Sequence, residues 1–413
     1  MSQKPLRGLR IVDLTHVWAG PLGTRMLGDL GADIVKVEAP LARGPALSPP
    51  GGVGVFAGGE PGTEPWNRQS VTIKLNRSKR GICIDLKSSQ GKDTLLELVR
   101  VADVVIENFS ARAMNNLGLG YEVLSDANPQ IIYVAMPGFG SYGPYSALAA
   151  FGPSVEPMTG VGALLGYSKD QPRNSAMALV DAVAGVSAAA AVVTAVNRRS
   201  ETGRGAKVEL SLHEAGISLF GEFLVDSQLG AQHTPIGNAH PRYAPHGIYP
   251  ALGEDQWIAI ACPDQACWIA LRDEAGLWTG VEQFDEPSHR LAHRPALDKK
   301  LSEWTREQNK HELEQRLQAA GIPAGAVNTA PDVLEDAHLK ERGYWVDQAL
   351  DGQPTVRYPG LAIKLNQKER SVGRPAPKFG EHNREVLQEW LGSTTAEVDE
   401  LIAQGVLLDR PPG

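Results

Sequence analysis

The chain has 413 residues, of which 42% are hydrophobic and 21% are charged, and its formal net charge is -8 at pH 7. This length allows more than one core, and the acidic charge argues against a dedicated nucleic-acid binder, which would carry a basic surface. Cys83, Cys262 and Cys267 are too few for a disulfide framework, and no apolar leader segment is recognised. We therefore expect a cytoplasmic protein of two or more domains that has no nucleic-acid partner.

Short runs rich in β-branched residues alternate with helical patterns through the first third of the chain. Pro21 suits the first turn of a helix that Gly31 ends. Strands that alternate with helices favour an α/β fold with a parallel, doubly wound sheet. The runs predicted to be strands are Leu9–Leu14, Asp33–Val37, Gly81–Leu86, Val104–Glu107 and Ile131–Ala135.

Two longer segments have a distinctive composition. Residues 40–65 are crowded with Gly and Pro and show neither helical nor strand periodicity, so they are predicted to be a long loop. The uncharged run Ala182–Val196 is short for a membrane span and rich in Ala, Gly, Ser and Thr. It is predicted to be a buried helix, so we expect no membrane association.

The rest of the chain suggests a second, smaller domain. A strand is predicted at Lys207–Leu212, an apolar helix then runs to about Leu229, and the strand signal at Gln256–Cys262 precedes a charged amphipathic stretch at Lys299–Ala320. We assign residues 1–215 to a large domain, 216–230 to a connecting helix, 231–325 to a small α+β domain and 326–413 to a C-terminal part.

One glycine pattern resembles a cofactor motif. Residues 138–143 match G-x-G-x-x-G after a predicted strand, but Pro144 and Tyr145 interrupt the helix that a dinucleotide site needs. A glycine-rich loop that approaches a different ligand, or a simple turn, remains open. The turn Thr15–Gly23 could likewise receive an anionic ligand at a helix N-terminus or be purely structural.

The familiar metal and serine-nucleophile patterns are incomplete. His289 and His293 have the spacing of helical metal ligands, but Arg290 stands where a zinc protease has its glutamate. Cys262 and Cys267 lack a second cysteine pair, and the chain contains no G-x-S-x-G sequence. We therefore expect no metal site.

Asp181 is the one charge between Arg173 and Arg198, and it stands at the start of the alanine-rich helix. One interpretation is a structural N-cap whose carboxylate the helix dipole keeps ionised. The other is a carboxylate nucleophile held in a buried place. The pattern alone leaves both interpretations open.

A series of short motifs extends in order over nearly the whole chain. They are Leu6–Asp13, Ala19–Pro21, Gly31–Glu38, Asn76, Lys79–Arg80, Asp85–Lys87, Ala102–Phe109, Thr202–Gly205, Gly237–Asn238, Ala320–Gly325 and Gly380–His382. As an ordered set, they resemble the class III coenzyme A (CoA) transferases, the family of the formyl-CoA, carnitine and benzylsuccinate CoA-transferases.

The resemblance implies a Rossmann-like large domain built from both ends of the chain, a small domain between them and an interlocked-ring dimer. It also makes Asp181 the nucleophile, which forms an aspartyl mixed anhydride and then an aspartyl-CoA thioester. CoA enters as a substrate thioester, and no cofactor is tightly bound. The implied CoA contacts are Val17, Trp18, Asp85, Leu86, Lys87, Asn108, Phe109 and Ser110.

The chain departs from the family pattern at several positions. Arginines that bind CoA phosphates in formyl-CoA transferase correspond to Ala39 and Asn116, so Arg43, Arg80 or Arg112 is expected to replace them. Gly152 stands where that enzyme has an acidic residue. The residues expected around the acyl group and its oxyanion are Gly138, Phe139, Gly140, Phe151, Gly152 and Glu156.

Two other functions are open. A 2-methylacyl-CoA racemase needs a His-Asp pair where this chain has Phe151 and Gly152. A non-catalytic CoA-binding subunit of a paired complex would not need Asp181. The expected partners are an acyl-CoA and a carboxylic acid. Trp18 and the stretch Phe151–Gly160 suggest a larger or aromatic dicarboxylic acid, with succinyl-CoA as the donor. A homodimer is expected over a paired heteromer.

Overall fold

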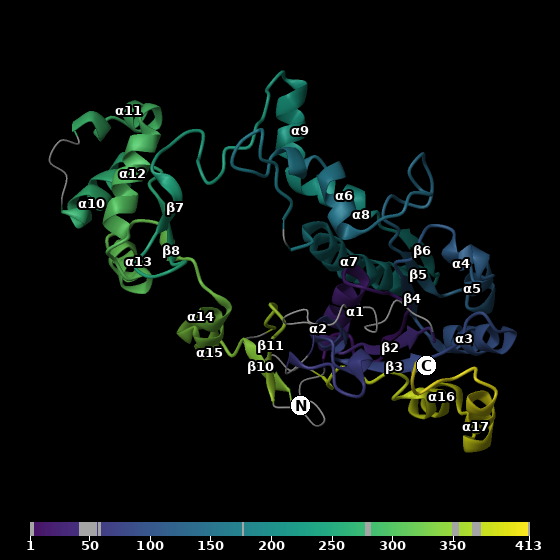
Figure 1. Ribbon diagram of the computed structural model, residues 1–413. Helices are drawn as coiled ribbons and strands as arrows, with labels where there is room; N and C mark the ends of the chain where they lie inside the picture. The colour runs from purple at the N-terminus through teal and green to yellow at the C-terminus, as the bar shows by residue number, and fades with distance from the viewer. Residues whose placement is uncertain are drawn as a thin grey trace. The chain divides into compact units, whose positions relative to one another are not determined.

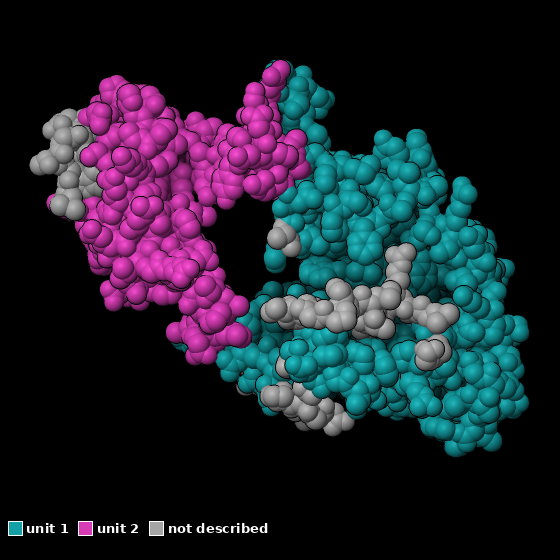
Figure 2. All heavy atoms as spheres, in the orientation of Figure 1, with its two compact units in different colours: residues 1–161, 174–231, 340–413 teal, residues 162–173, 232–339 magenta. Residues whose placement is uncertain are grey.

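The structure is a computed structural model that describes residues 4–40, 56, 59–175, 177–276, 282–348, 355–365 and 373–411. Most of the loop predicted at residues 40–65, including Arg43, lies outside this set. The chain divides into two compact units (Figure 2). Unit 1 comprises Met1–Val161, Asn174–Ala231 and Lys340–Gly413, and unit 2 comprises Gly162–Arg173 and Gln232–Leu339.

Unit 1 is built on a six-stranded sheet in which every neighbouring pair of strands is parallel. The predicted parallel sheet is confirmed, and the strand order is β3-β2-β1-β4-β5-β6. The order reverses between β1 and β4, and the position beyond the carboxyl ends of such strands is where α/β sheets bind ligands in a crevice. The strands are β1 Arg10–Asp13, β2 Asp33–Glu38, β3 Lys79–Cys83, β4 Val104–Glu107, β5 Ile132–Ala135 and β6 Ala206–Glu209.

Helices cover both faces of this sheet (Figure 1). One face packs against α3 Ser89–Val101, α5 Tyr121–Ala127, α16 Asn383–Leu391 and α17 Thr395–Ala403. The other packs against α1 Ala19–Asp29, α7 Leu179–Thr202 and α8 Leu212–Ile217. Burial on both faces explains why the central strands β4 and β5 are nearly continuous apolar runs rather than alternating.

Two glycines let α1 and α7 approach each other closely. A Cβ atom added at Gly23 would lie 2.6 Å from the carbonyl oxygen of Gly185, and one added at Gly185 would lie 2.5 Å from the carbonyl oxygen of Ala19. Helix α7 is long and apolar enough to cross a membrane by length and composition. Val180, Ala184, Ala188 and Val192 pack in the core beside the sheet, whereas Val186 and Val193 are exposed, so the helix predicted to be buried is buried on one face.

The C-terminal segment returns to the first three strands. The Gly81 N–H donates to Nδ1 of His382 at 3.1 Å, and the Cys83 N–H donates to Oδ1 of Asn383 at 2.9 Å. These bonds join the edge strand β3 to α16, about 300 residues later in the chain. The outer edge of the sheet is therefore covered by the C-terminal helices.

The remaining elements of unit 1 are short. The apolar segment predicted as one helix to Leu229 is divided by a 3₁₀ turn at Ser218–Phe220 into α8 and α9. The other elements are α2 Ser70–Asn76, α4 Ala113–Asn116, α6 Gly152–Met158, α9 Gly221–Gln228, and the antiparallel pair β10 Trp345–Gln348 and β11 Val356–Pro359.

Unit 2 contains a three-stranded antiparallel sheet and its own core. The charged amphipathic stretch Lys299–Ala320 is divided between two helices, because α12 ends at Thr305 and the Asn309 side chain caps α13. The unit reaches Leu339 and includes residues 162–173, which the sequence analysis did not place there. Its elements are β7 His246–Pro250, β8 Trp257–Ala261, β9 Ala324–Ala326, α10 Gln265–Ala275, α11 Pro287–Ala292, α12 Arg294–Thr305, α13 Lys310–Ala319 and α14 Ala330–Glu335, and α15 Ala337–Glu341 follows.

Candidate active site

The loops after β1 and β4 meet beyond the carboxyl ends of these strands. The His16 N–H donates to Oδ1 of Asn108 at 2.7 Å, and Nδ2 of Asn108 donates back to the His16 carbonyl oxygen at 2.8 Å. The rings of His16 and Phe109 stack with their centroids 5.3 Å apart. The structure thus brings the predicted CoA contacts at residues 17–18 and 108–110 together where the strand order reverses.

Val17 has an unusual backbone in this loop. Its φ is +65°, in the left-handed region, and its side chain is 51% exposed. A β-branched residue in that conformation costs about 1–3 kcal/mol and persists only where the surroundings fix it. The adjacent Trp18 begins α1, and Nζ of Lys74 lies 5.0 Å from its ring centroid. Strain of this kind is common where a loop is shaped for a ligand.

A buried network of charged and polar side chains, centred on Asp13 at the end of β1, holds the same loop in place. Asp13, the last residue of β1, accepts the Thr15 N–H at 2.9 Å, the Thr24 hydroxyl at 2.7 Å and Nζ of Lys79 at 3.0 Å. Burial alone would raise the pKa of Asp13, but Lys79, Lys36 and the two hydroxyls outweigh it and hold the pKa well below its usual range. This network therefore holds the loop after β1 in position against α1 and β3. It could not be recognised from the sequence patterns.

Glu107, the last residue of β4, holds the loop that follows β4 in the same way. Its Oε2 accepts the Phe109 N–H at 2.7 Å, and its Oε1 accepts the hydroxyl of Tyr133 at 2.8 Å. Burial raises the pKa of Glu107 to about 7. The sequence analysis quoted Glu107 only as part of a motif, although an acidic residue ending an apolar strand was a usable signal.

The predicted contacts after β3 lie at the same carboxyl edge of the sheet. Leu86 is buried, whereas Lys87 is exposed and its N–H donates to Oδ1 of Asp85 at 3.0 Å. Strand β2 separates this segment from the loop after β1. The Lys87 side chain is thus accessible to solvent.

Arg80 requires a correction. Its guanidinium pairs with Asp33, Glu385 and Glu389, and the Arg80 side chain is 4% exposed. Asp33 opens β2, so the network lies at the amino edge of the sheet, opposite the crevice. Arg80 therefore ties the C-terminal helix α16 to the sheet rather than receiving a phosphate.

Arg112 is placed differently. It is exposed at the start of α4, in the segment that follows β4. Asn116, which stands where a family arginine was expected, is also exposed in this helix. Of the three arginines proposed as replacements, Arg112 is the one that the structure describes with a solvent-accessible side chain.

Asp181 lies in the first turn of α7, but it does not cap the helix. The N-cap residue is Ala178, whose φ is +48°, and the Asp181 N–H bonds to the Ala178 carbonyl oxygen at 3.0 Å. No side chain on the N-cap residue closes this end. The N-cap interpretation is therefore wrong, since Asp181 stands three residues beyond the cap.

The Asp181 carboxylate occupies space that Gly152 leaves open. A Cβ atom added at Gly152 would lie 1.8 Å from Oδ2 of Asp181. Gly152 is the first residue of α6, and its φ is not in the left-handed region. The glycine is thus required by the contact with the carboxylate rather than by its own backbone.

The pKa of Asp181 is raised to about 6, first by burial and then by the neighbouring charge of Glu156. The expectation that the helix dipole would hold this carboxylate firmly ionised is therefore corrected. A group with this pKa is about nine-tenths ionised at pH 7. It combines the ionised form with the poor solvation that favours a nucleophile.

Helix α7 carries Asp181 to the crevice. Gly185, four residues after Asp181, packs on the carbonyl oxygen of Ala19 at the start of α1. Residues four apart share a helix face and are separated by about 6 Å along the axis. The candidate nucleophile consequently lies one helical turn from the point where Trp18 leads into α1.

The glycine-rich loop after β5 adjoins this site, but a carboxylate lies beside part of it. A Cβ atom at Gly138 would lie 2.0 Å from Cβ of Ala150, which precedes Phe151 and Gly152. The Ser141 N–H, however, donates to Oε1 of Glu209 at 3.1 Å. A carboxylate there would repel an oxyanion, so residues 140–141 are poor oxyanion donors.

The aromatic residues of this region have different exposures. Phe139 is half-buried, with its ring centroid 5.8 Å from that of Tyr145 and 5.6 Å from that of His213. Phe151 is 50% exposed and precedes α6. Residues 141–150 form turns in place of the helix that a dinucleotide site requires.

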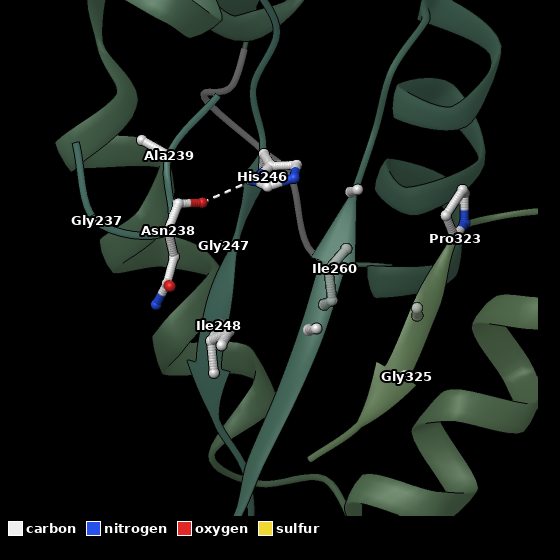
Figure 3. A pocket seen from close by; sticks show the side chains of 12 residues that line it. Gly237, Asn238, Ala239, His246, Gly247, Ile248, Ile260, Pro323 and Gly325 are labelled. Carbon is white, nitrogen blue, oxygen red and sulfur yellow. Dashed lines mark hydrogen bonds between the residues drawn. The ribbon is translucent and has the colours of Figure 1, made fainter. Parts of the chain in front are cut away.

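Unit 2 contains a separate cavity of about 470 Å³ (Figure 3). Nδ1 of His246 donates to the Asn238 carbonyl oxygen at its rim, at 2.7 Å. The lining joins two motifs that the sequence analysis singled out, Gly237–Asn238 and Ala320–Gly325. The lining segments are Gly237–Ala239, His246–Ile248, Ala259–Ala261 and Pro323–Gly325.

A family model described as "CoA-transferase family III" matches residues 6–383. The chain belongs to CoA-transferase family III. A succinate–glutarate CoA-transferase of Agrobacterium fabrum is 31% identical over 395 residues, covering 93% of this chain and 95% of the relative. A succinyl-CoA–D-citramalate CoA-transferase of Chloroflexus aurantiacus is 29% identical and covers 98% of both chains.

The fold agrees with this family. A CAIB/BAIF family protein from Brucella suis superposes with a TM-score of 0.84 at 30% identity, covering 94% of this chain and 100% of that one. The family III match and the names of these relatives show a CoA-transferase, and they do not favour the racemase alternative.

Proposed function

We propose that this family III enzyme transfers CoA between two carboxylic acids through covalent intermediates on Asp181. The observation that carries the proposal is the half-buried Asp181 carboxylate, which lies against Gly152 and has a pKa of about 6. Helix α7 places it one turn from the start of α1, beside the crevice at the reversal of strand order. A nucleophile is thus supported next to a natural site for a nucleotide.

The proposed chemistry alternates between two carbonyl groups. The ionised Asp181 attacks the donor thioester carbonyl, which forms a mixed anhydride and releases the CoA thiolate. The thiolate attacks the aspartyl carbonyl, so the donor acid leaves and an aspartyl-CoA thioester remains. The acceptor carboxylate then attacks this thioester, which expels the CoA thiolate and forms a second mixed anhydride. The thiolate attacks the acceptor's carbonyl in this anhydride, so the acceptor leaves as acyl-CoA and the Asp181 carboxylate is the leaving group. Asp181 is regenerated, and every step uses a carboxylate, a thiolate or their acyl derivatives.

CoA binding is proposed at the carboxyl edge of the sheet. The segments at residues 17–18 and 108–110 would flank the nucleotide, in the manner of a Rossmann-like crevice. Lys87 and Arg112 are exposed cations after β3 and β4, and we propose them as the phosphate contacts. Binding energy from the nucleotide would hold the thioester in line with Asp181.

The substrates are proposed to be dicarboxylic acids, with succinyl-CoA as the donor. This proposal rests on the names of the relatives, which concern succinate with glutarate and succinyl-CoA with D-citramalate. The exposed Phe151 next to Gly152 offers an apolar surface for the acid's carbon chain. A cytoplasmic enzyme that uses CoA only as a substrate would fit this chemistry.

The geometry disfavours proton transfer at the α-carbon. A racemase needs an acid or base on each side of that carbon. A side chain at residue 152 would occupy the position of Oδ2 of Asp181. Gly152 therefore cannot be replaced by a second proton carrier without displacing the first carboxylate.

An exchange assay separates the two chemistries. We expect the purified enzyme to move CoA from succinyl-CoA to glutarate or another dicarboxylate, as detected by mass spectrometry of the acyl-CoA products. In heavy water, a chiral 2-methylacyl-CoA should gain no α-deuterium. Rapid deuterium incorporation without CoA transfer to any acid in a dicarboxylate panel would favour the racemase.

We further propose that two copies associate, with the interlocked-ring arrangement implied by the family resemblance. Unit 1 is assembled from three segments of the chain, and unit 2 is inserted between them. On and after α9, Leu224, Val225 and Leu229 are 46%, 55% and 81% exposed. Apolar side chains exposed in this way favour burial against another chain, and we propose a second copy as that chain.

A further inference from the structure

Glu156 is a buried carboxylate that the proposed mechanism does not use. It lies in α6 and is 1% exposed. Its Oε1 accepts the Ser175 N–H at 2.7 Å, and its Oε2 accepts the Ser175 hydroxyl at 2.7 Å and the Leu179 N–H at 3.2 Å. All three of these partners are neutral donors, so among the described residues the carboxylate is held by hydrogen bonds.

These three bonds fix the chain that leads to Asp181. Ala178, the N-cap of α7, has a left-handed φ of +48° and no polar side chain to close the helix. That conformation is unfavourable for a residue with a Cβ atom and needs support from its surroundings. Glu156 binds on both sides of it, at Ser175 and at Leu179, and satisfies an N–H that the first turn leaves unpaired.

One face of α6 contacts both the Asp181 carboxylate and the backbone that leads to Asp181. Gly152 and Glu156 are four residues apart, so they share a face of this short helix. Gly152 lies against the Asp181 carboxylate, and Glu156 holds the backbone two residues before Asp181. The direction of the Asp181 side chain is therefore set from a single element.

We propose that Glu156 is a positioning residue for Asp181, which fixes the first turn of α7 so that the nucleophile stands over Gly152. The proposal rests on the nucleophilic role of Asp181 proposed above. Glu156 itself has its oxygens occupied by the protein and does not need to touch a substrate.

Glu156→Gln tests the proposal, because the amide keeps the shape but loses the charge and one acceptor oxygen. We expect kcat to fall by about 10- to 100-fold with little change in the KM for acyl-CoA. In the wild-type enzyme, kcat/KM should rise with pH through about 6, where Asp181 ionises. The Glu156 charge helps to raise that pKa, so the rise should move to lower pH in the variant.

Two further variants make the result specific. Glu214→Gln removes the same charge from the exposed surface of α8 and should leave both kcat and the pH profile unchanged. Ser175→Ala removes one bond to Glu156 but keeps its charge, so kcat should fall several-fold with an unshifted pH profile. Ser175→Ala also decides the matter if Glu156→Gln does not fold.

The proposal is overturned if Glu156→Gln folds and has the kcat and pH profile of the wild type, or if Ser175→Ala keeps full kcat. A folded Glu156→Gln variant with reduced stability but an unshifted pH profile would make Glu156 purely structural. Failure of the proposed function is seen separately, in the wild-type enzyme, as the absence of any CoA adduct on Asp181.

Discussion

Asp181→Ala should lower CoA transfer by about 10³-fold or more while the variant still binds acyl-CoA, because removing a covalent nucleophile abolishes the steps that depend on it. The stability of the variant should not fall. Burial and the Glu156 charge raise the pKa of Asp181 in the folded state, so its ionised form disfavours folding above pH 6. Steady-state kinetics, calorimetric binding of acyl-CoA and thermal unfolding at pH 7.5 measure these three effects.

Measuring the stability of Asp181→Ala and of the wild type at several pH values provides an internal control. As the pH falls from about 6 toward the ordinary aspartate range, Asp181 becomes protonated and any stability gain of Asp181→Ala should shrink. Glu312→Gln removes an acidic residue from the same first-turn position of α13 and should retain full activity. Substantial transfer by Asp181→Ala would refute the covalent role.

Gly152→Ala is expected to have the second largest effect, a fall in kcat of about 100-fold. The added Cβ atom would lie 1.8 Å from Oδ2 of Asp181, so the carboxylate must rotate away from its position. The backbone of Gly152 suits alanine, and the clash is with the end of a side chain, so the melting temperature should change little. Kinetics at saturating acyl-CoA and thermal unfolding test both statements.

Gly221→Ala is the matched control. Gly221 is the first residue of α9, as Gly152 is of α6, and a Cβ atom there would meet nothing within 4 Å. The control should keep wild-type kcat. Normal kcat in Gly152→Ala would show that the contact with the Asp181 carboxylate has no catalytic importance.

The parallel sheet could be predicted because its signals are local. Strands buried on both faces are continuous apolar runs, and β4 was placed at the correct residues, whereas β3 begins two residues earlier than predicted. The loop-helix boundaries were harder. Nothing local in Lys299–Ala320 marks the break between α12 and α13 except the capping residue Asn309.

The site was predicted less completely than the fold, because much of it depends on contacts between distant segments. Asp181 stood out as an isolated charge, but only the structure shows that Ala178 is the N-cap and that Gly152 makes room for the carboxylate. Arg80 was misassigned, since its partners Glu385 and Glu389 lie about 300 residues further along the chain. The Asp13–Lys79 pair was missed for the same reason.

The central claim is that CoA becomes covalently attached to Asp181, and rapid acid quenching followed by peptide mass spectrometry tests it most directly. After incubation with succinyl-CoA alone, we expect the peptide that contains Asp181 to carry CoA as a thioester. Hydroxylamine should convert the same residue to a hydroxamate, and Asp181→Ala should show neither product. CoA transfer to an acceptor acid with Asp181 unmodified throughout, or with the adduct on another residue, would contradict the account.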